Sequence, residues 1–126
     1  ASLLQQVSQS LAAFYQDLQD INAAAGSNVS DRVLTLTFSE FGRRVAENGA
    51  LGTDHGQASV MFAMGDSVNG DIYGELPDIA TTNSKGNLPH HTDFRQVYAT
   101  AIDWMQGPGA HTALLPGSPY TTIPFI

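Results

Sequence analysis

An aspartate and a histidine stand side by side in the segment Gly52-Thr53-Asp54-His55-Gly56. Carboxylate oxygens and imidazole nitrogens are both ligands for a divalent ion such as Zn²⁺. Adjacent residues of a strand point to opposite faces, so two adjacent ligands for one ion require a turn, which the flanking glycines permit. The pair is therefore a candidate half of a metal site. The alternative is that Asp54 caps a turn and His55 is an ordinary surface residue.

Two adjacent arginines, Arg43 and Arg44, come shortly before this segment. A guanidinium group binds phosphate or sulfate through two parallel hydrogen bonds, so either arginine could face an anionic substrate. Glu40 lies three residues before Arg43, and the two would form an ion pair if the chain turned helical after Phe38. We interpret Glu40 as structural and leave the role of Arg43 open.

The other conspicuous polar and aromatic residues have simpler interpretations. Asp93 directly precedes an apolar stripe, which is typical of a helix N-terminus. Tyr98 and Trp104 are interpreted as packing residues. His111 lies in a glycine-rich tail with no partner near it in the sequence, so we expect it to be exposed.

Composition excludes several classes of function. The chain has 126 residues and a formal net charge of −7, with five basic residues. Nucleic acid is an unlikely partner for it because phosphate binding needs a basic face. No apolar run approaches the roughly 20 residues that cross a bilayer. The chain has no cysteine, which excludes disulfides and thiolate ligands but leaves the compartment open.

The elements that must position these residues can be read from the apolar periodicity. Apolar residues three and four positions apart predict an amphipathic helix from Ser2 to Ala25, ended by Gly26. Val33 to Phe38 is rich in β-branched and apolar residues and predicts a central strand. Ser39 to Gln57 is interpreted as a long functional loop, and Ala58 to Met64 as a second strand.

The second half of the chain is less regular. A turn at Asn69-Gly70-Asp71 suggests a short hairpin. The segment from Leu76 to His91 is expected to be an exposed loop. A second helix is predicted from Thr92 or Asp93 to about Met105, and the tail from Gly107 is expected to be irregular. The order of elements indicates an α/β fold, with a sheet flanked by helices, in one domain or a fragment of one over residues 1–126.

Three blocks of sequence carry a resemblance to a known family. They are Thr37-Phe38-Ser39-Glu40-Phe41-Gly42-Arg43, Gly52-Thr53-Asp54-His55-Gly56 and Thr92-Asp93-Phe94-Arg95-Gln96-Val97-Tyr98-Ala99. In this order they resemble the carboxyl-terminal part of a family of exported bacterial sulfatase-like proteins of unknown function, often made with a twin-arginine signal, in the alkaline phosphatase and sulfatase superfamily. The resemblance implies a partial alkaline phosphatase-like layered fold.

The resemblance also implies roles for individual residues. Asp54 and His55 match the superfamily's metal-binding Asp-His pair, and His91 matches its later histidine ligand, with His90 as a weaker substitute. Arg43 would then face an anionic ester, and the cofactor would be a divalent metal such as Zn²⁺, Ca²⁺, Mn²⁺ or Mg²⁺. The superfamily's nucleophile lies in the first half of the chain and has no counterpart here, so this part is expected to be inactive alone, with no catalytic residue of its own.

Three hypotheses follow. In the first, the parent protein is a metal-dependent hydrolase of phosphate or sulfate esters, periplasmic or secreted. In the second, the chain is a non-catalytic envelope or surface module with a vestigial site. In the third, it is a processed product, since it begins inside a helical pattern without an initiator Met. Exposure of Leu4, Leu11 and Leu18 then predicts self-association, or association with a missing amino-terminal part.

Overall fold

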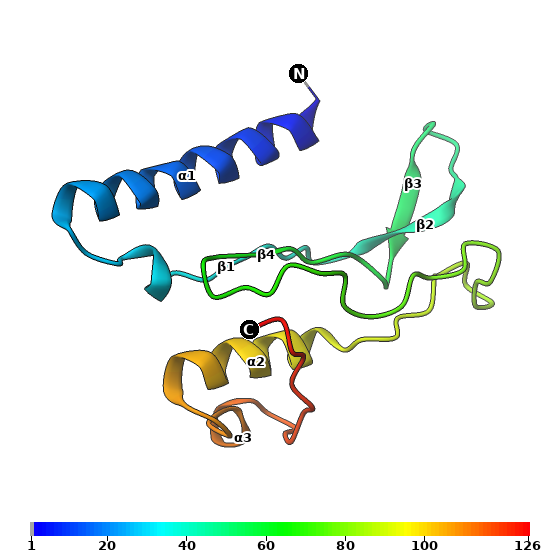
Figure 1. Cartoon of the computed structure of the whole chain (residues 1–126). Helices are drawn as coiled ribbons and strands as arrows, with labels where there is room; N and C mark the ends of the chain where they lie inside the picture. Colours follow the sequence, from blue (N-terminus) through cyan, green and yellow to red (C-terminus); the bar gives the residue numbers. More distant parts are fainter. Residues whose placement is uncertain (1) are drawn as a thin grey trace. The chain divides into compact units, whose positions relative to one another are not determined.

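The computed structural model describes residues 2–126, which divide into two compact units. The first unit contains the residues up to Thr35 together with Ala63–Val68, and the second contains Leu36–Phe62 and Asn69–Ile126. Between residues 2 and 126 the chain forms three helices, a short 3-10 helix and four strands (Figure 1). Their bounds are α1 Leu3–Ala25, the 3-10 helix Ser30–Arg32, β1 Thr35–Leu36, β2 Gly42–Glu47, β3 Thr53–Gly56, β4 Ala63–Met64, α2 Phe94–Gln106 and α3 His111–Leu114.

The first unit is built on α1, which confirms the predicted amino-terminal helix. The Ser2 side chain accepts a hydrogen bond from the amide of Gln5 at 3.2 Å and so caps the first turn. Gly26 ends the helix in the left-handed conformation, with φ of 61°, where a side chain would be strained. Leu18, with 8% of its surface accessible, is the buried apolar residue of α1.

The Asp66 carboxylate ties α1 to the returning segment of the same unit. It accepts hydrogen bonds from the hydroxyl of Ser30 and from that of Tyr15, the latter at 2.5 Å. These two donors stabilise the charged form and lower the pKa of Asp66 below its ordinary value. Polar contacts therefore replace a large apolar core in this unit.

The predicted strand from Val33 to Phe38 is wrong in its extent, because only Thr35 and Leu36 form a strand, which pairs with β4. Beyond it, the Thr37 side-chain oxygen accepts the amide of Phe62 at 2.8 Å, where a regular ladder would use a main-chain carbonyl. Phe38 is exposed. The second predicted strand likewise shrinks to Ala63 and Met64, and no strand forms at the predicted hairpin around Asn69 to Tyr73.

In the second unit, α2 confirms the predicted helix and the role of Asp93. The Asp93 side chain accepts the amide of Arg95, and the Gln96 side chain accepts the amide of Asp93, which together form a capping box. Ala99 and Ala101 are buried, and so is Phe125 from the tail, which stacks edge-on against Tyr73. Small residues of α2 and Phe125 of the tail thus belong to the buried apolar residues of the second unit.

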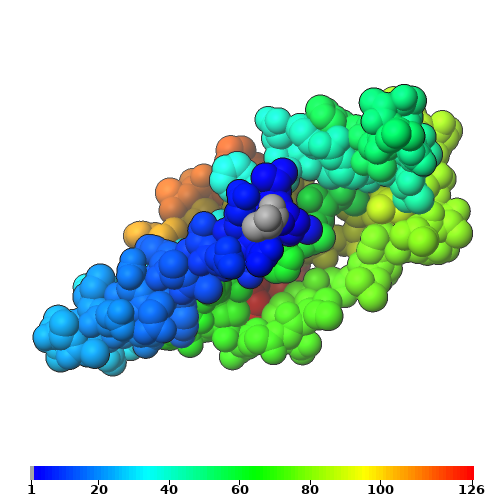
Figure 2. Space-filling view, turned by 90° about the horizontal axis from the view of Figure 1, so that it is seen from above, coloured from blue at the N-terminus to red at the C-terminus, as the bar shows by residue number. Residues whose placement is uncertain are grey.

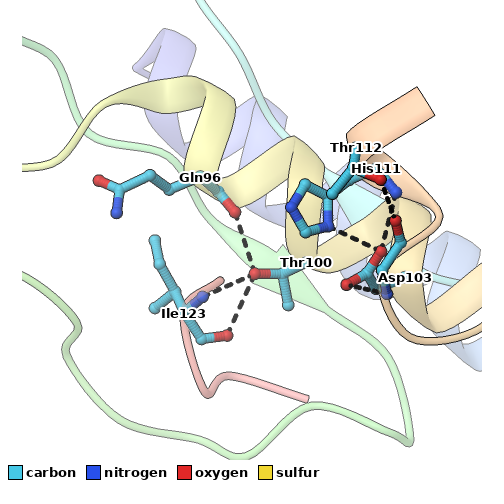
Figure 3. A network of polar contacts seen from close by, with 7 residues as sticks. Gln96, Thr100, Asp103, His111, Thr112 and Ile123 are labelled. Carbon is cyan, nitrogen blue, oxygen red and sulfur yellow. Dashed lines mark hydrogen bonds and ion pairs between the residues drawn. The ribbon is translucent and has the colours of Figure 1, made fainter. Parts of the chain in front are cut away.

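Thr100 joins α2 to the carboxyl-terminal tail (Figure 3). Its hydroxyl oxygen accepts the amide of Ile123 at 2.8 Å and lies 3.0 Å from the carbonyl of Gln96 and 3.2 Å from that of Ile123. Because Thr100 is buried, water cannot take the place of these hydrogen-bond partners.

We expect Thr100→Val to destabilise the second unit by about 1–3 kcal/mol, because it leaves the amide of Ile123 without an acceptor. Urea unfolding followed by the fluorescence of Trp104, the single tryptophan, measures the change. Thr82→Val is the matched control at an exposed threonine, with an expected change within about 0.5 kcal/mol. Equal stability of the two variants would contradict this role for Thr100.

No helix in the region from residue 2 to residue 126 is long and apolar enough to cross a bilayer. This agrees with the absence of a long apolar run in the sequence.

Candidate functional site

The segment that carries Asp54 and His55 is a β-hairpin, not the loop expected from the sequence. Strands β2 and β3 pair antiparallel, with Gly42 opposite Gly56 and Arg43 opposite His55. A Cβ on Gly42 would lie 1.5 Å from the carbonyl oxygen of Ala58, and one on Gly56 would lie 2.7 Å from the main chain of Arg43. Gly56 is therefore required for close backbone approach within the strand pair, and Gly42 for close approach to the segment that follows β3.

Asn48 organises the connection between the two strands. Its side-chain oxygen accepts the amides of Ala50 at 3.0 Å and Gly52 at 3.2 Å. Its side-chain nitrogen donates to the Asp54 carboxylate at 3.0 Å. One amide side chain therefore holds the turn and also orients the candidate metal ligand.

The Asp54 carboxylate is accessible and only weakly engaged. Its side chain is 59% exposed, and its nearest cation is Arg44, with Nη1 at 3.9 Å from Oδ2. An ion pair of this length between exposed groups contributes little stability. Asp54 thus retains oxygen lone pairs that an ion could use.

His55 lies on the opposite face of β3 from Asp54, because side chains alternate along a strand. Its ring stacks on that of Phe41, with centroids 3.5 Å apart and an interplanar angle of 14°. Arg43 is close to the same aromatic ring, with Cζ 5.2 Å from the Phe41 centroid. Phe41, Arg43 and His55 therefore form one cluster on this hairpin.

Arg43 contacts the hairpin itself. Its Nη1 donates to the carbonyl of Thr53 at 2.8 Å, which leaves other guanidinium N–H groups for an anion. The ion pair with Glu40 expected for a helical turn does not form, since no salt bridge within residues 2–126 joins Arg43 to Glu40. The strand conformation of residues 42–47 explains this, since an i to i+3 pair needs a helix.

His91 lies outside these contacts. Its Nδ1 is 3.4 Å from a carboxylate oxygen of Glu75, and both side chains are exposed. Within residues 2–126, no three His, Asp or Glu side chains gather closely enough to hold a metal ion. The structure thus joins Arg43, Phe41 and His55, and separately Asp54 with Arg44 and Asn48, while the joint metal role of Asp54, His55 and His91 stays a prediction.

A second polar pair, Asp103 and His111, was missed in the sequence, where His111 was expected to be exposed. It is buried, with 7% of its surface accessible, and its Nδ1 lies 2.9 Å from the Asp103 carboxylate (Figure 3). The same carboxylate accepts the amides of His111 at 2.9 Å and Gly109 at 3.0 Å. The amide of His111 is the main cause that lowers the pKa of Asp103 to about 2.

One sequence signal could have found this pair. An aspartate in the last turn of a helix lies unfavourably near the negative end of the helix dipole, which suggests a specific partner. Gly107-Pro108-Gly109 then turns the chain so that His111 returns to the carboxylate. Asp103 also borders an open pocket of about 330 Å³, whose lining includes Thr100, Trp104 and Ile123.

The part of the chain from residue 2 onward combines two helices of more than three turns with two small two-stranded sheets, which is compatible with an α/β class. It belongs to the family described as protein of unknown function (DUF1501), whose model matches residues 1–105. The match contains Arg43, Asp54, His55 and His91 and ends before His111. No curated protein and no solved structure matches the chain.

Proposed function

We propose that this chain supplies part of the metal site of an exported, periplasmic or secreted hydrolase of phosphate or sulfate esters, with an alkaline phosphatase-like layered fold. The resemblance of the three sequence blocks to the sulfatase-like family motivates the proposal. The structural observation that supports it best is the Asp54 carboxylate, which is accessible and held only by Asn48 and a 3.9 Å ion pair.

In this proposal Asp54 and His55 bind a divalent ion, which is Zn²⁺, Ca²⁺, Mn²⁺ or Mg²⁺, and His91 binds a neighbouring one. Arg43 binds the anionic group of the ester through guanidinium N–H groups not used by Thr53. Because Asp54 and His55 lie on opposite faces of β3, binding one ion through both requires β3 to leave its strand geometry. The nucleophile and the remaining ligands come from outside this chain, so the chain alone does not turn over substrate.

We expect the chain to bind Zn²⁺ in a stoichiometric complex and Asp54→Ala to bind it at least about tenfold more weakly, because a direct ligand is removed. Titration calorimetry and elemental analysis of dialysed protein measure both quantities. Asp71→Ala is the matched control, since Asp71 is also an exposed aspartate of the second unit. Equal Zn²⁺ affinity of the wild type and Asp54→Ala would show that Asp54 is not a metal ligand.

A second candidate function is a non-catalytic envelope or surface module with a vestigial site. The observation that favours it is that both residues of the pair already have protein partners: His55 stacks on Phe41, and Asp54 contacts Arg44 and Asn48. An Asp54→Ala, His55→Ala double variant with unchanged stability and no change in metal content would favour this module over the hydrolase.

A further inference from the structure

The sequence contains two Asn-Gly pairs, Asn48-Gly49 and Asn69-Gly70. In such a pair the main-chain nitrogen of the glycine can attack the side-chain carbonyl carbon of the asparagine, because glycine has no Cβ to obstruct the approach. The attack requires the asparagine side chain and the following peptide group to rotate toward each other. Hydrogen bonds that hold either group oppose this rotation, so the structure distinguishes two pairs that share the same reactive groups.

Asn48 is held on both its side chain and its main chain. Its side-chain oxygen accepts the amides of Ala50 and Gly52, and its side-chain nitrogen donates to the Asp54 carboxylate. Its own amide donates to the carbonyl of Gly52 at 2.8 Å, and its carbonyl accepts the amide of Leu51 at 3.1 Å. Moving this side chain toward the nitrogen of the following glycine would break several of these bonds.

Asn69 is held through its main chain alone. Its amide donates to the carbonyl of Phe125 at 2.9 Å, and its carbonyl accepts the hydroxyl of Tyr73 at 2.9 Å. No hydrogen bond within residues 2–126 engages the Asn69 side chain or the amide of Gly70. Both residues are exposed, and atoms in green, the colour of the chain around residues 60–75, form part of the surface seen in Figure 2. The Asn69 side chain is therefore free to rotate.

We propose that Asn69 is a site of spontaneous deamidation, through a succinimide formed with the main-chain nitrogen of Gly70. This nitrogen loses its proton and bonds to the side-chain carbonyl carbon of Asn69. The bond from that carbon to the side-chain nitrogen breaks, and the nitrogen leaves as ammonia with the proton. Water then opens the ring at either carbonyl and leaves aspartate or isoaspartate at position 69. The reaction consumes water and no other reactant.

Isoaspartate at this position is expected to loosen the carboxyl-terminal tail. It lengthens the main chain by one methylene group between the amide that binds Phe125 and the carbonyl that binds Tyr73, so both bonds cannot be kept unchanged. Phe125 is buried and packs edge-on against Tyr73. Aspartate, in contrast, adds a charge and keeps the main chain. None of these residues takes part in the proposed metal or ester site, so the inference does not depend on the proposed function.

Incubation of the folded chain at mildly alkaline pH, followed by peptide mass spectrometry, tests the proposal. Asn69 should convert at least about tenfold faster than Asn48, since Asn48 must first give up its hydrogen bonds. In guanidinium chloride, where both pairs are unfolded, the two rates should be similar. The two positions lie in one tryptic peptide, residues 45–85. Electron-transfer fragmentation separates them and also distinguishes aspartate from isoaspartate.

Gly70→Ala should slow the conversion of Asn69 several-fold, because the added Cβ obstructs the attacking nitrogen. The fold tolerates this change, since a Cβ there meets no atom within 4 Å. Gly49→Ala is the matched control and should leave the rate at Asn69 unchanged. Equal rates at Asn48 and Asn69 in the folded chain, or no conversion at Asn69, would overturn the proposal. An unchanged rate in Gly70→Ala would overturn the assigned nucleophile.

The effect on the tail is measured on the deamidated protein after its separation by ion exchange. Its urea unfolding midpoint, followed by Trp104 fluorescence, is compared with that of Asn69→Asp, which has the same added charge and a normal main chain. The isoaspartate form should unfold at the lower urea concentration. Equal midpoints would contradict the loosening of the tail.

Discussion

Gly42→Ala is expected to unpair β2 from β3 and to destabilise the hairpin by about 3 kcal/mol or more. The added Cβ would lie 1.5 Å from the carbonyl oxygen of Ala58 and 2.4 Å from its carbonyl carbon, so the main chain must move. Because Gly42 is opposite Gly56 and Arg43 is opposite His55, the movement reaches the candidate site directly. The stack of His55 on Phe41 should be lost with the pairing.

Amide hydrogen exchange of residues 42–56 measures this effect, since the hairpin amides should lose protection in the variant. Gly49→Ala is the control in the same hairpin, because a Cβ there meets no atom within 4 Å. Protection that is unchanged in Gly42→Ala would mean that the segment around Ala58 moves away at little cost. That result would contradict the close approach as the reason for glycine at this position.

Asp103→Asn should lower the stability of the second unit at neutral pH and make it less sensitive to acid. The pKa of Asp103 in the folded chain is about 2, depressed below its ordinary value of 3.8, mainly by the amide of His111. A depressed carboxyl pKa contributes stability that is present above the ordinary value and is lost as the pH falls through about 2. Asparagine removes the charge, so the amides of Gly109 and His111 lose a charge-assisted acceptor.

Urea unfolding at pH 7, 4 and 2.5, followed by Trp104 fluorescence, measures this dependence. The midpoint of the wild type should fall between pH 4 and 2.5 by more than that of Asp103→Asn. Asp93 also has a pKa of about 2, chiefly because Arg95 donates to its carboxylate, so some acid sensitivity should persist in the variant. Asp71→Asn controls for the loss of one carboxylate, and an acid response identical in all three proteins would exclude Asp103 as a source of it.

The two long helices were predictable because their signals are local. The apolar spacing of α1 and α2 identifies them, and Ser2, Gly26 and Asp93 mark their ends through bonds to residues within a few positions. The hairpin was not predictable in the same way. Its strands are polar and short, and the residue that requires glycine at position 42 is Ala58, whose main chain lies close to it and which local sequence does not identify.

Contacts between residues far apart in the sequence account for the other differences between the predicted and the observed structure. Thr37 was expected in a regular strand, but its hydroxyl takes the amide of Phe62, 25 residues away. His111 was expected in solvent, but the turn through Gly107 and Gly109 returns it to Asp103. The Thr37–Phe62 and His111–Asp103 contacts could not be predicted from residue spacing in the sequence. Their free energy depends on which polar groups the folded chain removes from water.

The amino-acid sequence by itself determined the two main helices and their caps, the acidic charge, and the nomination of Arg43, Asp54, His55 and His91 as site candidates. Only the tertiary structure decided that Asp54 and His55 lie on opposite faces of one strand, that Arg43 shares a ring contact with His55 through Phe41, and that His111 is buried against Asp103. The physical reason is that helix propensity and capping act over three or four residues. Strand pairing and burial depend on residues that only the folded chain brings together.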